Sequence, residues 1–227
     1  MLFLIYINDL IERCGAYSEV YVVDDDAKFY RHILSDDDNK ISQYALDALQ
    51  KWLNLNLNKC QVVTFGRSAD KSYKYTIRDC NNQTIPLKRG IQVLDLGVCF
   101  DEKLSFKEHI HAKISKTYMV LGLIILNFKY LTIPTFIQLY ISMVRSHLDY
   151  CSSIWVPYRK GDIESLEKFQ KRATKILPGL KNLPYSDRLK ICKIPTLHYR
   201  RIRRDMIETY KIVSGKYQPD VASSYVV

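Results

Sequence analysis

Three consecutive carboxylates, Asp24, Asp25 and Asp26, stand inside residues 20–31, where residues that favour strands lie on both sides. This pattern predicts a strand, a tight turn and a second strand, with the carboxylates at the tip. Adjacent side chains on a strand point to opposite faces, so neighbouring carboxylates converge only where the backbone turns. Like charges held that close raise one another's pKa unless a cation neutralises them. The tip is therefore either a divalent metal site, suited to phosphoryl or nucleotidyl transfer, or a solvated acidic turn.

Charge is divided unevenly between the two halves of the chain. Residues 1–100 contain 12 Lys and Arg against 13 Asp and Glu, a net charge of −1. Residues 101–227 contain 22 against 11, a net charge of +11. A surplus of that size indicates a polyanionic partner for the second half. The apolar fraction of 47% is typical of a folded protein and excludes a disordered chain.

Cysteines and apolar runs predict the compartment. The six cysteines include no C-x-x-C pair, which favours reduced intracellular thiols, in the cytoplasm or the nucleus. The uncharged runs 117–128 and 130–144 are shorter than the ~20 residues that span a bilayer, so we expect buried helices and no membrane partner. Residues 1–7 are too short for a signal peptide. His109 and His111 have no further ligand at metal-binding spacing, and we expect both at the surface.

Residues 1–100 are expected to mix short strands with a helix. Asp36, Asp37 and Asp38 complement a helix dipole, so they predict a helix start before an apolar face at Ile41, Ala45, Leu49 and Trp52. A strand is predicted at residues 59–65, and residues 73–77 and 83–87 are expected to form a hairpin.

From residue 104 onward the apolar period becomes helical, with one face at Ile110, Ile114, Thr117, Leu121 and Ile124 and another at Phe136, Tyr140, Val144 and Leu148. The fold class is therefore α+β.

Two predicted helices carry clustered cations. The helix that opens at residues 161–162 leaves four cations mostly outward: Lys168, Lys171, Arg172 and Lys175. The last helix, about residues 196–214, places an apolar side at Tyr199, Ile202, Met206, Tyr210 and Val213, with Arg200, Arg201, Arg203 and Arg204 around the rest. Such faces either neutralise nucleic-acid phosphates without reading bases or are simply solvated.

The ordered set of motifs resembles the reverse transcriptases of jockey-like non-LTR retrotransposons. The segments that carry the resemblance are FLIYINDL at 3–10, VDDDAKFYR at 23–31, NLNKC at 56–60, LDLGV at 94–98, SHLDY at 146–150, SIW at 153–155, LEKFQKR at 166–172, PYSDR at 184–188 and YKIVSG at 210–215. The resemblance implies a partial polymerase palm over residues 1–100 and an all-helical, thumb-like region over residues 101–227. It implies RNA-directed DNA synthesis in the parent enzyme, with an RNA template and a DNA primer as partners.

The resemblance also assigns roles to single residues. It makes Asp25 and Asp26 the catalytic and metal-binding pair for Mg²⁺ or Mn²⁺, because the alternative pair, Asp24 and Asp25, loses every match downstream. Lys59 would protonate the departing pyrophosphate, although a solvated lysine at a strand start is the other interpretation. Gly97 would abut the primer end, where the lack of a side chain permits close approach.

Other family features are not among these 227 residues: a further Asp from an earlier palm strand, the fingers and an endonuclease domain. We therefore expect an N-terminally truncated portion that does not polymerise alone. Two alternatives stay open: a non-catalytic helical nucleic-acid-binding protein, and a decayed retroelement remnant without a selected role.

Overall fold

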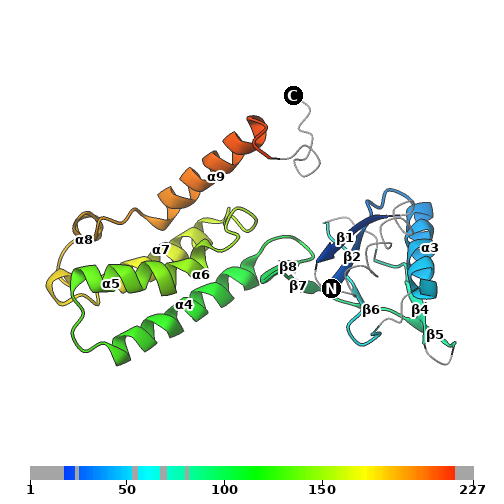
Figure 1. Cartoon of the computed structure of the whole chain (residues 1–227), viewed down its shortest axis with the longest axis horizontal. Coiled ribbons are helices and arrows are strands. Elements are labelled where there is room, and N and C mark those ends of the chain that lie inside the picture. The colour runs from blue at the N-terminus through cyan, green and yellow to red at the C-terminus, as the bar shows by residue number, and fades with distance from the viewer. Residues whose placement is uncertain (1–17, 24–25, 53–55, 67–70, 80–81, 218–227) are drawn as a thin grey trace. The chain divides into compact units, whose positions relative to one another are not determined.

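The computed structural model describes residues 18–23, 26–52, 56–66, 71–79 and 82–217. The chain divides into two compact units, one of residues 1–93 and 101–104 and one of residues 94–100 and 105–227. In the described residues the first unit contains short strands and one helix, and the second is almost entirely helical (Figure 1). The fold is therefore α+β, with helix predominating over strand.

The acidic segment lies at an antiparallel hairpin. Strands β1 (Glu19–Val23) and β2 (Asp26–Tyr30) pair in a register that sets Val23 opposite Asp26. The rings of Tyr21 and Tyr30 add an edge-to-face contact, with 5.5 Å between their centroids. The predicted pair of strands is confirmed, and Asp26 is the first residue of the second strand.

Helix α3 (Asp36–Trp52) begins at the second run of aspartates. The carboxylate of Asp38 accepts hydrogen bonds from the backbone N–H groups of Leu34 and Ser35 and pairs with Arg31 at 2.9 Å. The Arg31 contact and these bonds lower the pKa of Asp38 to about 2. Ala45 and Leu49 are buried and Ile41 is half-buried, whereas the side chain of Trp52 lies outside what the structure describes. The predicted start of this helix is confirmed, and so is the inner face at Ala45 and Leu49.

The remaining described strands are short. The parallel pair consists of β3 (Gln61–Val62) and β6 (Lys88–Arg89), and the antiparallel pair of β4 (Thr76–Arg78) and β5 (Thr84–Pro86). Strands β7 (Gln92–Asp95) and β8 (Val98–Asp101) form a further pair. The hairpin predicted from residues 73–77 and 83–87 is confirmed with shorter strands, whereas the strand expected over residues 59–65 is only two residues long. Within the described residues the strands form separate two-stranded sheets rather than one sheet.

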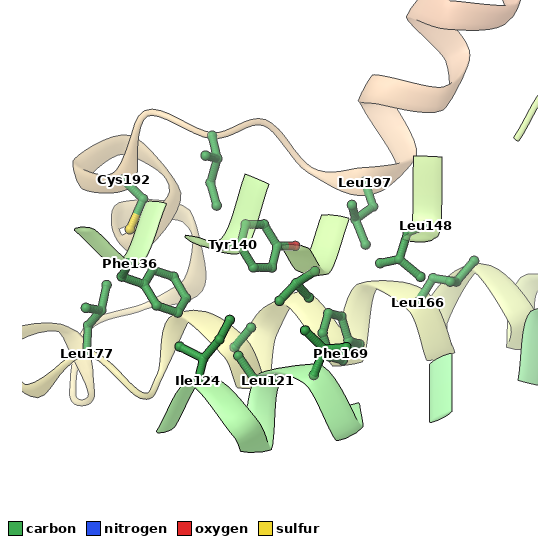
Figure 2. Close-up of a cluster of buried hydrophobic side chains, with 14 of the residues drawn as sticks. Leu121, Ile124, Phe136, Tyr140, Leu148, Leu166, Phe169, Leu177, Cys192 and Leu197 are labelled. Atoms are coloured by element: carbon green, nitrogen blue, oxygen red, sulfur yellow. The ribbon is translucent and has the colours of Figure 1, made fainter. Parts of the chain in front are cut away.

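The second unit contains six α-helices, a π-helix and a 3₁₀-helix in its described part. They are α4 (Lys107–Asn127), α5 (Ile133–Leu139), η1 (Tyr140–Arg145), α6 (Ser146–Asp149), α7 (Lys160–Thr174), η2 (Pro178–Leu180), α8 (Tyr185–Cys192) and α9 (Leu197–Val213). Figure 2 shows the core, where Leu121 and Ile124 of α4 meet Phe136, Tyr140 and Phe169. No helix in the described residues is long and apolar enough to cross a membrane.

The π-helix explains how one apolar face persists from α5 to α6. Phe136, Tyr140, Val144 and Leu148 recur every fourth residue, and all four are buried. In an α-helix of 3.6 residues per turn this spacing drifts by about 40° at each step. The wider turn of η1, which covers Tyr140–Arg145, absorbs that drift. The predicted face is confirmed, and the π-helix is the device that keeps it in register.

A buried polar chain joins these helices. Tyr140 donates a hydrogen bond to Oε1 of Gln170 at 2.7 Å, and Nε2 of Gln170 donates to the hydroxyl of Tyr185 at 3.1 Å and to the carbonyl of Pro195 at 2.9 Å. Tyr185 in turn donates to the carboxylate of Glu167. Burial raises the pKa of both tyrosines. These hydrogen bonds hold α7 against η1 and against the segment that leads into α9.

Two expectations about burial are wrong. His109 is 3% exposed: its Nδ1 accepts a hydrogen bond from the N–H of Cys99, and its ring lies 5.2 Å from that of Trp155. On α4 the uncharged run is buried on one face only, because Met119, Leu123 and Leu126 are exposed. The spacing of these residues places them on the side away from the core.

Helix α9 exposes the side on which its apolar residues lie. Its bounds agree closely, with Thr196 as N-cap and Ser214 as C-cap. Its apolar side, however, is exposed at every position named above: Tyr199, Ile202, Met206, Tyr210 and Val213. The residues that α9 buries are Leu197 and Arg201.

Candidate nucleic-acid interface

The acidic hairpin supplies the candidate metal ligands. Asp26 opens β2 opposite Val23, whereas Asp24 and Asp25 lie outside the described residues, as does the side chain of Asp26. Among the side chains that the structure does describe, no group of three or more His, Cys, Asp or Glu could hold a metal ion. The metal-binding roles of Asp25 and Asp26 therefore stay predictions.

Lys59 lies at the end of a tight turn just before β3. Its backbone N–H donates to the carbonyl of Asn56 at 2.9 Å, and its side chain is exposed. An exposed lysine in this place can reach a phosphate or remain solvated. Its predicted role as an acid stays a prediction.

Gly97 is held in the turn between β7 and β8. Leu96 and Gly97 have φ values of 45° and 76°, so two successive residues adopt the left-handed conformation that only glycine takes without strain. The hydroxyl of Tyr150 donates to the carbonyl of Leu96 at 2.8 Å, and a Cβ at position 97 would lie 3.4 Å from the Tyr150 ring. Lys113 places its ammonium 5.3 Å from the centre of that ring. The turn is therefore fixed by an aromatic side chain with a cation beside it.

The four cations predicted on one helix are all exposed, three on α7 and the last at its C-cap: Lys168, Lys171, Arg172 and Lys175. We call these residues the α7 basic face. The opposite side of the helix buries Leu166, Phe169 and Ala173, which explains why this face is turned to solvent.

Two of these cations lie over aromatic rings. The ammonium of Lys171 is 5.5 Å from the centre of the Tyr185 ring, and the guanidinium of Arg172 is 5.5 Å from that of Tyr118. Such contacts restrict long side chains that would otherwise be mobile. The α7 basic face is thus partly organised before any polyanion binds.

The arginines of α9 are placed differently. Arg200 and Arg204 contact the carboxylate of Asp149 at 3.0 Å and 3.3 Å. Arg203 is exposed. Arg201 is 6% exposed, and its guanidinium lies 5.2 Å from the centre of the Trp155 ring. The prediction that Arg201 contacts phosphate is therefore wrong, because a buried guanidinium cannot reach a backbone phosphate.

Sequence reasoning missed Arg145 and Asp149 as members of a charged cluster. Arg145 of η1 contacts the same carboxylate, at 3.4 Å from its Nε. The Arg145–Asp149 pair has the i, i+4 spacing of a helical ion pair, and that spacing could have revealed it. The contacts from α9 come from residues about fifty positions later, which no local pattern reveals.

Comparisons of the chain with protein-family models, with curated proteins and with solved structures found no match. What the structure establishes is an α+β protein whose helical unit exposes a basic helix face.

Proposed function

We propose that the chain is the C-terminal palm portion and thumb of a reverse transcriptase from a non-LTR retrotransposon. In the parent enzyme, Asp25 and Asp26 would bind Mg²⁺ or Mn²⁺ for nucleotidyl transfer, and the helical unit would hold the RNA template and DNA primer. The observation that carries the proposal is the antiparallel β1–β2 hairpin whose second strand opens at Asp26. A helix or an unpaired loop at that position would have removed its basis.

The two units carry different charged groups, and this supports the same proposal. The acidic hairpin belongs to the strand-containing unit, and the α7 basic face to the helical unit. A polymerase needs carboxylates for its metals and, elsewhere, cations for the phosphate backbone. The turn at Gly97, supported by Tyr150, would be the contact with the primer end.

Two-metal transfer needs carboxylates that bridge both ions. The further Asp of the family is not among the residues of this chain, so we expect binding of nucleic acid without synthesis. Template-dependent primer extension by the purified chain, with Mg²⁺ or Mn²⁺, would contradict that expectation.

The binding itself is tested by the salt dependence of affinity for a labelled RNA–DNA duplex. Four phosphate contacts by the α7 basic face predict a slope of the log association constant against log salt of roughly −3.6, which is a loss of about 150-fold between 50 and 200 mM salt. Replacing Lys168 by Gln should reduce the slope by about 0.9. Lys181→Gln, at an exposed lysine outside the face, is the matched control.

A non-catalytic nucleic-acid-binding protein is the second candidate. The cation–aromatic contacts on α7 favour it, because they organise the binding face without any metal. Mn²⁺ titration of the native chain and of Asp25→Asn discriminates the two functions. Metal affinity lost in the variant supports the polymerase origin, whereas duplex binding without any metal affinity at the hairpin supports the second candidate.

A further inference from the structure

Three arginines from two parts of the helical unit surround one carboxylate. Arg145 of η1 and Arg200 of α9 approach Oδ2 of Asp149 with their Nε atoms, at 3.4 Å and 3.0 Å. Arg204 approaches Oδ1 at 3.3 Å and also donates to the backbone carbonyl of Asp149 at 2.6 Å and to the hydroxyl of Ser152. We call Arg145, Asp149, Arg200 and Arg204 the Asp149 cluster.

The cluster contains two more positive charges than negative ones. Three further charged residues of α9 have electrostatic influence on it: the buried Arg201, the half-buried Asp205 and Glu208. Arg201 and Asp205 offset one another, and Glu208 is paired with Lys211 at 3.0 Å. Each guanidinium has five N–H donors, whereas one carboxylate accepts about four hydrogen bonds. Within the described residues, Nε of Arg145 makes no hydrogen bond at all. Donors and charge therefore both exceed what Asp149 can satisfy.

A salt bridge that served only to hold α9 in place would not need three arginines. Like charges this close repel one another: burial, and then Arg200, lower the pKa of Arg145. A second anion relieves that repulsion. It can reach the cluster, because the side chains of Arg200 and Arg204 remain 34% and 26% exposed.

We infer that the Asp149 cluster binds a phosphate group, taken up by the exposed donors of Arg200 and Arg204. Guanidinium forks match phosphate oxygens bidentately, which makes phosphate the best-fitting anion. The phosphate is either free or part of a nucleic-acid backbone. Only binding of a nucleic-acid phosphate rests on the proposed function. In that case the Asp149 cluster gives the helical unit a phosphate contact separate from the α7 basic face.

The first test uses inorganic phosphate alone, followed by ³¹P NMR on the full chain at constant ionic strength. The native chain should give a saturable shift, and Arg200→Gln should weaken the affinity about tenfold, since it removes a charge-assisted hydrogen-bond donor. Arg203→Gln, which removes the same charge from an exposed neighbour on α9, should behave as the native chain. Equal affinities for the two variants, or no saturable shift in the native chain, would overturn the inference.

A second variant keeps the test independent of folding defects. Asp149→Asn removes the competing anion, so phosphate should raise the midpoint of its thermal unfolding, followed by circular dichroism, more than that of the native chain. A general salting effect of phosphate would raise all midpoints alike. An equal rise in Asp149→Asn and in the native chain therefore counts against the site.

The source of the phosphate is decided with a labelled RNA–DNA duplex. If the source is the backbone, Arg200→Gln lowers the salt slope of duplex binding by about 0.9, whereas the control Lys181→Gln leaves it unchanged. If only the inorganic phosphate titration responds to Arg200→Gln, the ligand is free phosphate. Complete failure of the native chain to bind the duplex rejects the proposed function while leaving the phosphate result intact.

Discussion

Replacing Gln170 by Leu should destabilise the helical unit more than a single side-chain change usually does. The side chain of Gln170 is 1% exposed and makes three hydrogen bonds, to Tyr140, Tyr185 and Pro195. Leucine keeps most of the volume but leaves the hydroxyl of Tyr140, which is fully buried, without a partner. An unpaired buried hydroxyl costs about 1–3 kcal/mol, and each other lost bond about 1 kcal/mol. We expect a loss of about 3–5 kcal/mol.

Urea unfolding followed by tryptophan fluorescence measures this loss. The chain has two tryptophans, and a Trp52→Phe background leaves Trp155, which is fully buried in the helical unit, as the reporter. Gln138→Leu is the matched control: Gln138 is exposed on α5, so its replacement should change the stability by less than about 0.5 kcal/mol.

A double-mutant cycle tests the reason for the effect. Tyr140→Phe alone leaves Oε1 of Gln170 unpaired and should cost about 2 kcal/mol. The double variant removes donor and acceptor together, so its cost should fall below the sum of the single costs by at least about 1 kcal/mol. Two outcomes would refute the argument that the buried hydrogen bonds hold α7. One is a loss of unfolding free energy in Gln170→Leu no larger than in Gln138→Leu. The other is a double variant whose loss equals the sum of those of Gln170→Leu and Tyr140→Phe.

Two further perturbations test single sites. The pKa of His109 is lowered by burial from 6.5 to about 4, so its stabilising contribution is complete above pH 6.5 and is lost as the pH falls towards 4. The free energy of unfolding, from urea titrations at pH 7 and pH 5, should therefore fall by about 1–2 kcal/mol more in the native chain than in His109→Gln. Equal pH dependence in the two would contradict this. Gly97→Ala should cost about 1 kcal/mol through its positive φ rather than through contact with Tyr150, and Gly97→Asn should cost less because asparagine tolerates the left-handed region. An alanine variant as stable as the native chain, by urea midpoint, would refute that account.

Local patterns predicted the α+β class and several of its elements correctly. The acidic first turn of α3, the four-residue spacing from Phe136 to Leu148, and the ends of α9 at Thr196 and Ser214 were all readable from the sequence. Each depends on interactions within a few residues: the helix dipole, the side-chain period, or a capping hydroxyl. The exception is the π-helix at Tyr140–Arg145, whose role becomes clear only when the drift of the apolar face is counted.

Features set by distant residues could not be predicted. His109 is buried because Trp155 and the backbone of Cys99 enclose it, and Arg201 because its guanidinium covers the Trp155 ring. Neither residue carries a local sign of burial, because a histidine and an arginine usually lie at the surface. For the same reason no local pattern reveals that α9 buries Leu197 and Arg201 and exposes its apolar side.

The burial and pairing of arginines on α9 change what the charge surplus of residues 101–227 means for nucleic-acid binding. The net charge of +11 in residues 101–227 counts every cation alike, but only those that solvent reaches can release counterions from nucleic acid. On α7 all four predicted contacts remain exposed, whereas on α9 Arg201 is buried and Arg200 and Arg204 share Asp149. Non-specific affinity should therefore depend mainly on α7, and a contribution from α9 beyond that of Arg203 requires the Asp149 cluster to accept a phosphate.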